Sequence, residues 1–157
     1  MVPRKILILG ASYGSLLGTK LLMAGHAVSL VCTPSTAELI NREGTIVRFP
    51  IRDRDALLDI SSKKLPGTLS ASAPDNVQPD GFDLVVLGMQ EGQYGTKGVR
   101  ELMARIAQSR VPSLAIMNMP PLTYLQRIPG LAIDSLQACY TDPSVWNGFE
   151  PGLVTWG

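Results

Sequence analysis

Glycine and serine residues are concentrated immediately after an apolar run near the N-terminus, a combination that suits phosphate binding. The run ends at Gly10, and Ser12, Gly14 and Ser15 follow closely. A glycine permits a sharp exit from a strand, and backbone N–H groups at the start of the next helix can bind a pyrophosphate. Gly14 would let the backbone approach the phosphate, while Gly18 would let the helix pack on the sheet. The predicted contacts are Gly10, Ala11, Ser12, Tyr13, Gly14 and Ser15.

The same turn has two other interpretations. Residues 10–14 match the pattern G-x-S-x-G of a hydrolase nucleophile, with Ser12 as the nucleophile. That chemistry needs a histidine base, and the only histidine is His26. We expect His26 to cap the far end of the helix that follows the turn, so no catalytic triad can be assembled. A glycine turn that only packs a helix is the other alternative.

A second group of hydroxyl side chains lies where the next apolar run, residues 27–32, ends. Thr33 can cap a short helix with Pro34 at its first position, or Ser35 can form a capping box with Glu38. An acidic residue at such a strand end would accept hydrogen bonds from the ribose 2′-hydroxyl of NAD. Here hydroxyls occupy a helix start instead, which favours NADP, with Thr33 and Ser35 at its 2′-phosphate. A purely capping role is the alternative, and it is compatible with binding.

Residues after two further strands are candidates for the other end of the cofactor. Met89 and Gln90 follow the apolar run that starts at Phe82, and we expect them to pass over the cofactor. Asn118 follows the buried run 113–117, where its amide could orient a substrate carbonyl or the cofactor ribose. Asn118 is therefore the catalytic candidate. A loop without a specific role and a purely structural turn are the alternatives for these positions.

Strand and helix signals alternate along the chain. This alternation predicts an α/β fold with right-handed crossovers and a doubly wound, mostly parallel, Rossmann-like sheet. Ligands of such sheets bind at the carboxyl ends of the strands, so residues 10–15, 32–36 and 88–93 should converge on one cleft bordered by Asn118. Helices are expected over residues 15–24, 33–44, 96–109 and 122–127, and strands over 5–9, 27–32, 45–51, 57–62, 67–71, 82–89, 113–117 and 131–140.

Composition excludes several classes of protein. The 157 residues suffice for one domain with a core, and a net charge of +1 without a basic block gives no indication of nucleic-acid binding. No apolar run is long enough for a signal peptide or a membrane span. Cys32 and Cys139 are too few for a disulfide framework or a metal site, which favours a reduced, cytoplasmic protein without a metal. The mixed charges of residues 48–55 are expected on the surface.

The last residues, 151–157, look like the beginning of a strand. We therefore expect the chain to be the front portion of a longer protein. The predicted domains are a dinucleotide-binding domain over residues 1–130 and the start of a linker or substrate domain over 131–157.

Several segments resemble the N-terminal domain of the ketopantoate reductase (2-dehydropantoate 2-reductase) family. They are the opening run KILILGASYGSLLGTKLLMAGHAVSLV, the segment AELINREGTIVRF, residues 82–93, and the pair Met117-Asn118. The resemblance covers residues 4 to about 128. It implies NADPH-dependent reduction of a 2-oxo acid, with the carbonyl polarised by a lysine of a helical C-terminal domain. It also implies a small carbonyl substrate as the partner, and a homodimer is left open.

The chain departs from this family pattern at four points. The glycine turn is one residue shorter, Gln90 stands where the family's loop lysine is expected, and Met119 replaces a glycine beside Asn118. The helical domain with the catalytic lysine and an acidic residue is absent from this chain. We therefore expect an NADP-dependent oxidoreductase whose residues 1–157 are inactive alone. The alternative is a non-catalytic Rossmann module that binds a nucleotide or acts as a scaffold.

Overall fold

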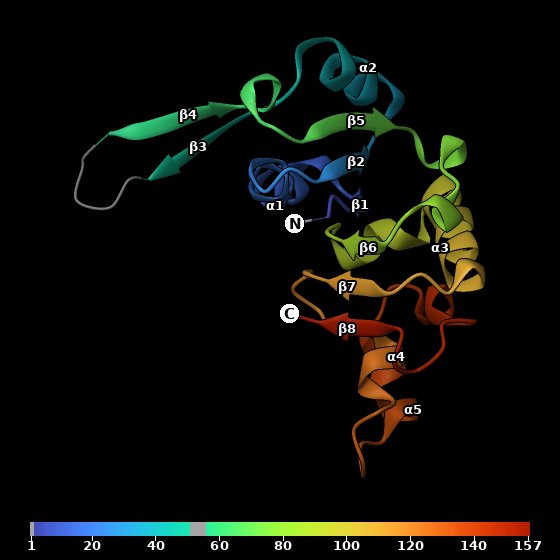
Figure 1. Ribbon diagram of the computed structural model, residues 1–157. Coiled ribbons are helices and arrows are strands. Elements are labelled where there is room, and N and C mark those ends of the chain that lie inside the picture. The colour runs from blue at the N-terminus through green and yellow to red at the C-terminus, as the bar shows by residue number, and fades with distance from the viewer. Residues whose placement is uncertain (1, 51–55) are drawn as a thin grey trace.

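The computed structural model describes residues 2–50 and 56–157, and its centre is a parallel β-sheet (Figure 1). The sheet has six strands in the order β5-β2-β1-β6-β7-β8, and every neighbouring pair is parallel. Counted along the chain, this is the order 3-2-1-4-5-6 of a Rossmann sheet, which confirms the predicted fold class. The strands are β1 (Lys5–Leu9), β2 (Ala27–Val31), β5 (Thr68–Ser72), β6 (Leu84–Leu87), β7 (Ser113–Ala115) and β8 (Val154–Trp156).

Helices cover both faces of the sheet. The side chains of its central strand β1 therefore alternate between two cores, one on each face. Ile6 and Ile8 of β1 pack in one core with helices α1 (Ala11–Met23) and α2 (Pro34–Glu43). Leu7 and Leu9 pack in the other core with helix α3 (Lys97–Ser109). Two short helices, α4 (Leu122–Leu125) and α5 (Ile133–Leu136), follow β7. Among the described helices, none is long and apolar enough to cross a membrane.

Helix α1 begins at Ala11, directly after Gly10, and not at residue 15 as the sequence suggested. Two of its glycines face the sheet and are buried. A Cβ at Gly14 would lie 2.7 Å from Cγ2 of Ile8, whereas a Cβ at Gly18 would lie 3.4 Å from Cγ1 of Val28. The helix therefore packs most closely on β1 at Gly14.

Helix α2 starts as one of the two predicted alternatives. The Thr33 side chain accepts a hydrogen bond from the Thr36 N–H at 3.4 Å, and Pro34 occupies the first helical turn. Further along, Asn41 binds the edge strand β5 with both atoms of its amide. Its Nδ2 donates to the Ala71 carbonyl and its Oδ1 accepts from the Ala71 N–H, each at 2.8 Å. The exposed Asn41 thus joins the helix to the open edge of the sheet.

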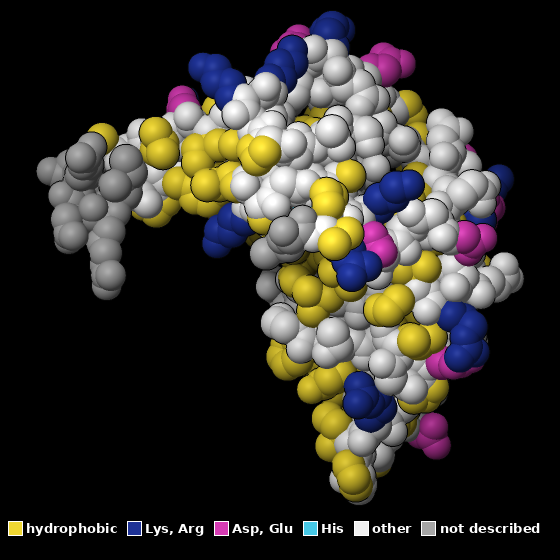
Figure 2. Space-filling model, in the orientation of Figure 1, with side chains coloured by type: hydrophobic (Ala, Val, Ile, Leu, Met, Phe, Trp, Pro, Cys, Tyr) yellow, Lys and Arg dark blue, Asp and Glu magenta, His cyan; other side chains and the backbone are white. Residues whose placement is uncertain are grey.

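Strands β3 (Ile46–Pro50) and β4 (Leu57–Ser61) form an antiparallel hairpin that projects from the body (Figure 1). Apolar side chains are exposed on it, including Ile46 and Leu57, which are 68% and 60% exposed (Figure 2). Arg48 pairs with Asp59 across the hairpin at 2.9 Å, on the surface as predicted. The other charges of that predicted surface run, residues 52–55, lie outside the described residues.

The C-terminal part of the described chain shares the sheet and its core. Residues 131–140 were expected to form a strand, but they form α5 and a turn of 3₁₀ helix. Tyr140, Trp146 and Phe149 then pack with α3, and β8 confirms the strand expected near the end. The predicted boundary at residue 130 thus lies between elements with a common core. The described residues contain no separate helical domain.

The contrast between the two helix glycines is testable. Gly14→Ala should lower the free energy of unfolding by roughly 1–3 kcal/mol, because the added methyl group overpacks the contact with Ile8. Gly18→Ala should be neutral or raise the free energy by up to about 1 kcal/mol, because alanine favours the helix and the site has more room. Urea unfolding of both variants measures this difference. Equal destabilisation by the two substitutions would contradict the packing described.

Candidate functional site

A cleft crosses the carboxyl ends of four neighbouring strands. Its main cavity, of about 310 Å³, lies at the ends of β2, β1 and β6. A smaller cavity of about 30 Å³ adjoins it at the ends of β6 and β7 and shares four lining residues with it. The segments expected to converge after β1, β2 and β6 therefore do so. The cleft is lined by Gly10, Ala11, Ser12, Tyr13, Val31, Cys32, Gly88, Met89, Gln90, Gln93, Ile116, Met117 and Asn118.

Gly10 joins the ends of three strands at the centre of this cleft. Its φ of 101° lies in the region that favours glycine, and a Cβ there would lie 2.9 Å from the Gly88 carbonyl oxygen. The Gly10 N–H donates to the Val31 carbonyl at 2.9 Å, and the Gly88 N–H donates to the Leu9 carbonyl at 2.9 Å. The turn is therefore held to both neighbouring strands before α1 begins.

The N-terminus of α1 faces the cleft without a side-chain cap. No side chain of the described residues forms a hydrogen bond to this end, and the first turn contains no acidic residue. The N–H groups of a first helical turn have no partner within the helix, and the helix dipole adds partial positive charge there. Ala11, Ser12 and Tyr13 line the cavity at this point. This arrangement fits an anionic group such as a pyrophosphate.

Two predicted phosphate contacts have other roles. Gly14 is buried against Ile8, so it serves helix packing, the role that the sequence interpretation gave to Gly18. The Ser15 hydroxyl donates to the Ala11 carbonyl within α1. Neither residue lines the cavity at the strand ends. The reason is the early helix start, which turns Gly14 toward the sheet.

The predicted 2′-phosphate residues lie beside the cavity and not in its lining. Thr33 Oγ1 is 2.9 Å from Thr36 Oγ1 and 3.4 Å from Ser35 Oγ, at the exposed start of α2. The hydroxyls thus form a small group around the helix cap. Their neighbour Cys32 lines the cavity. The pyrophosphate position therefore fits this structure more closely than the 2′-phosphate position does.

The first N–H groups of the loop after β6 are bonded within the protein. The Met89 N–H donates to the Tyr94 hydroxyl at 3.1 Å, and the Gln90 N–H donates to Gln93 Oε1 at 2.9 Å. Met89 and Gln90 line both cavities, as the sequence analysis placed them. Gln93 also lines the main cavity and was not predicted as a site residue. Its spacing of three from Gln90, typical of a capping pair, was the signal that could have identified it.

Asn118 is exposed and borders the smaller cavity, at the far end of the cleft from Cys32. The residue before it is fixed from β8, because Trp156 Nε1 donates to the Met117 carbonyl at 3.0 Å. The strand β8 thereby supports the end of the cleft where a substrate carbonyl was predicted. Ile116 and Met117 complete its lining and were not predicted.

The described lining contains no Asp, Glu, Lys, Arg or His side chain. The only histidine lies at the opposite end of the strands, where the Arg4 N–H donates to His26 Nδ1 at 3.1 Å. His26 therefore joins the start of β1 to the end of α1 and accepts a hydrogen bond there. His26 thus lies at the far end of α1 from Ser12, as expected from the sequence.

The fold is similar to that of a solved structure. A crystal structure described as a "putative ketopantoate reductase from Ralstonia solanacearum MolK2" matches with a TM-score of 0.53 and 20% identity, over 81% of this chain. The chain spans 36% of that protein's length. A SAM-dependent methyltransferase from Methanosarcina mazei matches with a TM-score of 0.35 and 15% identity, over 69% of this chain and 46% of the other. At 20% identity, the first match shows a shared fold.

No protein-family model and no curated protein matches this chain.

Cys32 provides a chemical probe of the cleft. Burial raises the pKa of its thiol, and the thiolate is the form that reacts with iodoacetamide. Alkylation of Cys32 should therefore be slower at neutral pH than that of the exposed Cys139. Its rate should rise only at a higher pH than for an ordinary thiol. Mass spectrometry of the labelled peptides, repeated with Cys139→Ser, measures both rates. Equal labelling of the two cysteines at neutral pH would contradict this burial.

Proposed function

We propose that the cleft binds NADP and that this chain is the cofactor-binding part of an oxidoreductase acting on a 2-oxo acid or a related carbonyl compound. The observation that carries the proposal is the uncapped start of α1 at the strand ends of a 3-2-1-4-5-6 sheet. Open parallel sheets bind ligands there, and a free helix N-terminus suits the pyrophosphate of a dinucleotide. The fold shared with the Ralstonia protein supports the same class of function.

Each part of the cleft has a separate role in this proposal. The N–H groups of Ala11, Ser12 and Tyr13 hold the pyrophosphate, and the cavity beside Cys32 takes the adenosine end. Carbonyl groups of the loop at Met89 can accept hydrogen bonds from ribose hydroxyls. Reduced NADP, when bound, would supply the hydride for reduction of the carbonyl carbon.

Asn118 is the proposed catalytic residue at the other end. Its side-chain amide can donate a hydrogen bond to a substrate carbonyl oxygen and so orient it. An amide does not supply a proton, and the described lining contains no carboxyl, ammonium or imidazole group. The proton for the carbonyl oxygen therefore comes from water or from a group outside this lining.

One specific observation favours the second candidate, a nucleotide-binding module without catalysis. The described cleft combines a site for an anion with a lining that has no charged side chain. Gln90 stands where the resembled family implies a lysine, and its backbone N–H is bonded to Gln93. Such a cleft can bind a nucleotide without supplying an acid or base. Binding of NADPH by the full-length protein without reduction of any 2-oxo acid tested would select this candidate.

An acidic residue at Ser12 tests the pyrophosphate site. Ser12→Asp should weaken binding of both NADPH and NADH at least about tenfold, because a carboxylate repels the pyrophosphate at this helix start. The same carboxylate should raise the helix stability by about 0.3–1 kcal/mol, since it interacts favourably with the dipole. Isothermal titration calorimetry and urea unfolding measure the two effects. Failure of the unsubstituted protein to bind either nucleotide would refute cofactor binding altogether.

The matched substitution at the start of α2 tests the choice between NADP and NAD. Ser35 occupies the same position in α2 as Ser12 does in α1, the second residue of the helix. Ser35→Asp should weaken NADPH binding at least about tenfold by repelling the 2′-phosphate and leave NADH binding unchanged. Calorimetry with both nucleotides gives the ratio of the NADPH and NADH dissociation constants. An unchanged affinity for NADPH would show that the 2′-phosphate does not bind at Thr33 and Ser35.

A further inference from the structure

The loop between β6 and α3 forms one wall of the cleft, and the backbone donors of its first residues, 88–90, are occupied within the protein. The N–H groups of Gly88, Met89 and Gln90 donate to the Leu9 carbonyl, the Tyr94 hydroxyl and Gln93 Oε1, respectively. The first acceptor is a backbone carbonyl of β1, and the last is a side chain of the capping pair Gln90–Gln93. The second is the hydroxyl of a core residue, so the position of Met89 depends on the core.

Tyr94 is fully buried, with 0% of its surface exposed. Its ring packs against Trp146, with ring centroids 5.8 Å apart, in the core that contains α3. Burial raises the pKa of Tyr94 far above its ordinary value, so the hydroxyl stays protonated and neutral. The ring is thus fixed by packing, and its oxygen lies 3.1 Å from the Met89 nitrogen.

We propose that Tyr94 is a positioning residue of the cleft, whose buried hydroxyl holds the Met89–Gln90 backbone in the conformation that lines both cavities. It acts through Met89, which lines the cleft, while Tyr94 itself does not. A core side chain thereby sets the spacing between the loop and the N-terminus of α1. Only the ligand measurement below rests on the proposed function. The position of the loop does not.

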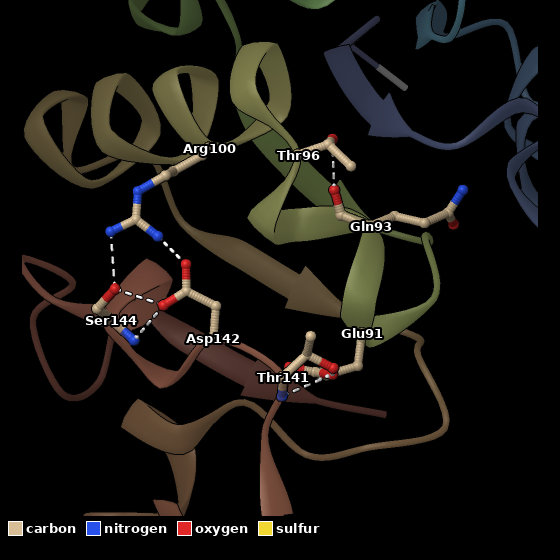
Figure 3. A network of polar contacts seen from close by, with 7 residues as sticks. All are labelled: Glu91, Gln93, Thr96, Arg100, Thr141, Asp142 and Ser144. Carbon is tan, nitrogen blue, oxygen red and sulfur yellow. Dashed lines mark hydrogen bonds and ion pairs between the residues drawn. The ribbon is translucent and has the colours of Figure 1, made fainter.

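The far side of the same loop is held by a polar network (Figure 3). The Glu91 carboxylate accepts hydrogen bonds from the Thr141 N–H at 3.0 Å and from the Thr141 hydroxyl at 2.7 Å. Arg100, near the start of α3, pairs with Asp142 and donates to Ser144 Oγ at 2.7 Å. These contacts fix the outer end of the loop to the segment that carries Trp146. The Met89 N–H, at the start of the loop, is bonded to Tyr94 instead.

Tyr94→Phe tests this role because it removes the hydroxyl and keeps the ring. Tyr140→Phe is the matched control: Tyr140 is also buried, and its hydroxyl donates to the Pro120 carbonyl, outside the described cleft lining. Amide hydrogen exchange of Met89, followed by NMR without ligand, should be at least about tenfold faster in Tyr94→Phe than in Tyr140→Phe. NADPH affinity should fall about three- to tenfold in Tyr94→Phe alone.

The outcomes separate the two proposals. Equal Met89 exchange in the two variants, or weakened NADPH binding in both, overturns the positioning role. Absence of NADPH binding by the unsubstituted protein refutes cofactor binding, and Met89 exchange still decides the role of Tyr94. If Tyr94→Phe does not fold, amide hydrogen exchange of Met89 in the unsubstituted protein tests the positioning role of Tyr94. Protection of the Met89 amide close to that of the core strands supports the proposal, and exchange at the rate of an open loop overturns it.

Discussion

The close approach of Gly10 to the Gly88 carbonyl is the contact on which the rest of the cleft depends. Only a residue without a Cβ fits there, because an added carbon would lie 2.9 Å from that oxygen and φ is 101°. The approach brings the exits of β1 and β6 together and starts α1 directly behind the turn. From this follow the direction of the free helix N-terminus and the burial of Gly14. The candidate site is therefore a consequence of how two strands end, more than of any one polar side chain.

The strands at the centre of the fold were predictable because they are buried on both faces. Near-continuous apolar runs such as residues 27–32 occur in parallel sheets, and their order follows from alternating helices and strands. The hydrophobic face of α3 was equally clear. In contrast, residues 131–140 have an apolar content that suits either a strand or a short helix. In the structure, α5 and the following 3₁₀ turn contain no buried residue, so no burial pattern was available to distinguish the two.

The candidate site was predictable as a place but only partly as a set of residues. The sequence places Ser12, Met89 and Asn118 at strand ends, and the structure brings them to one cleft. The sequence does not show which side of α1 each residue of the turn faces. Gly14 was therefore taken for a phosphate contact, although the early start of α1 turns it toward the sheet. Tyr94 was equally hidden, because its role comes from a core contact with a backbone N–H group.

The amide of Asn41 has a consequence for how molecules of this protein meet one another. Strand β5 ends the sheet on one side, and an edge strand exposes N–H and carbonyl groups to which a strand from another molecule can add. Asn41 occupies both groups of Ala71, near the end of that strand. An incoming strand would have to displace this side chain before it could form a regular ladder. The contact therefore acts as protection against aggregation through this edge, supplied by a helix that also completes the core.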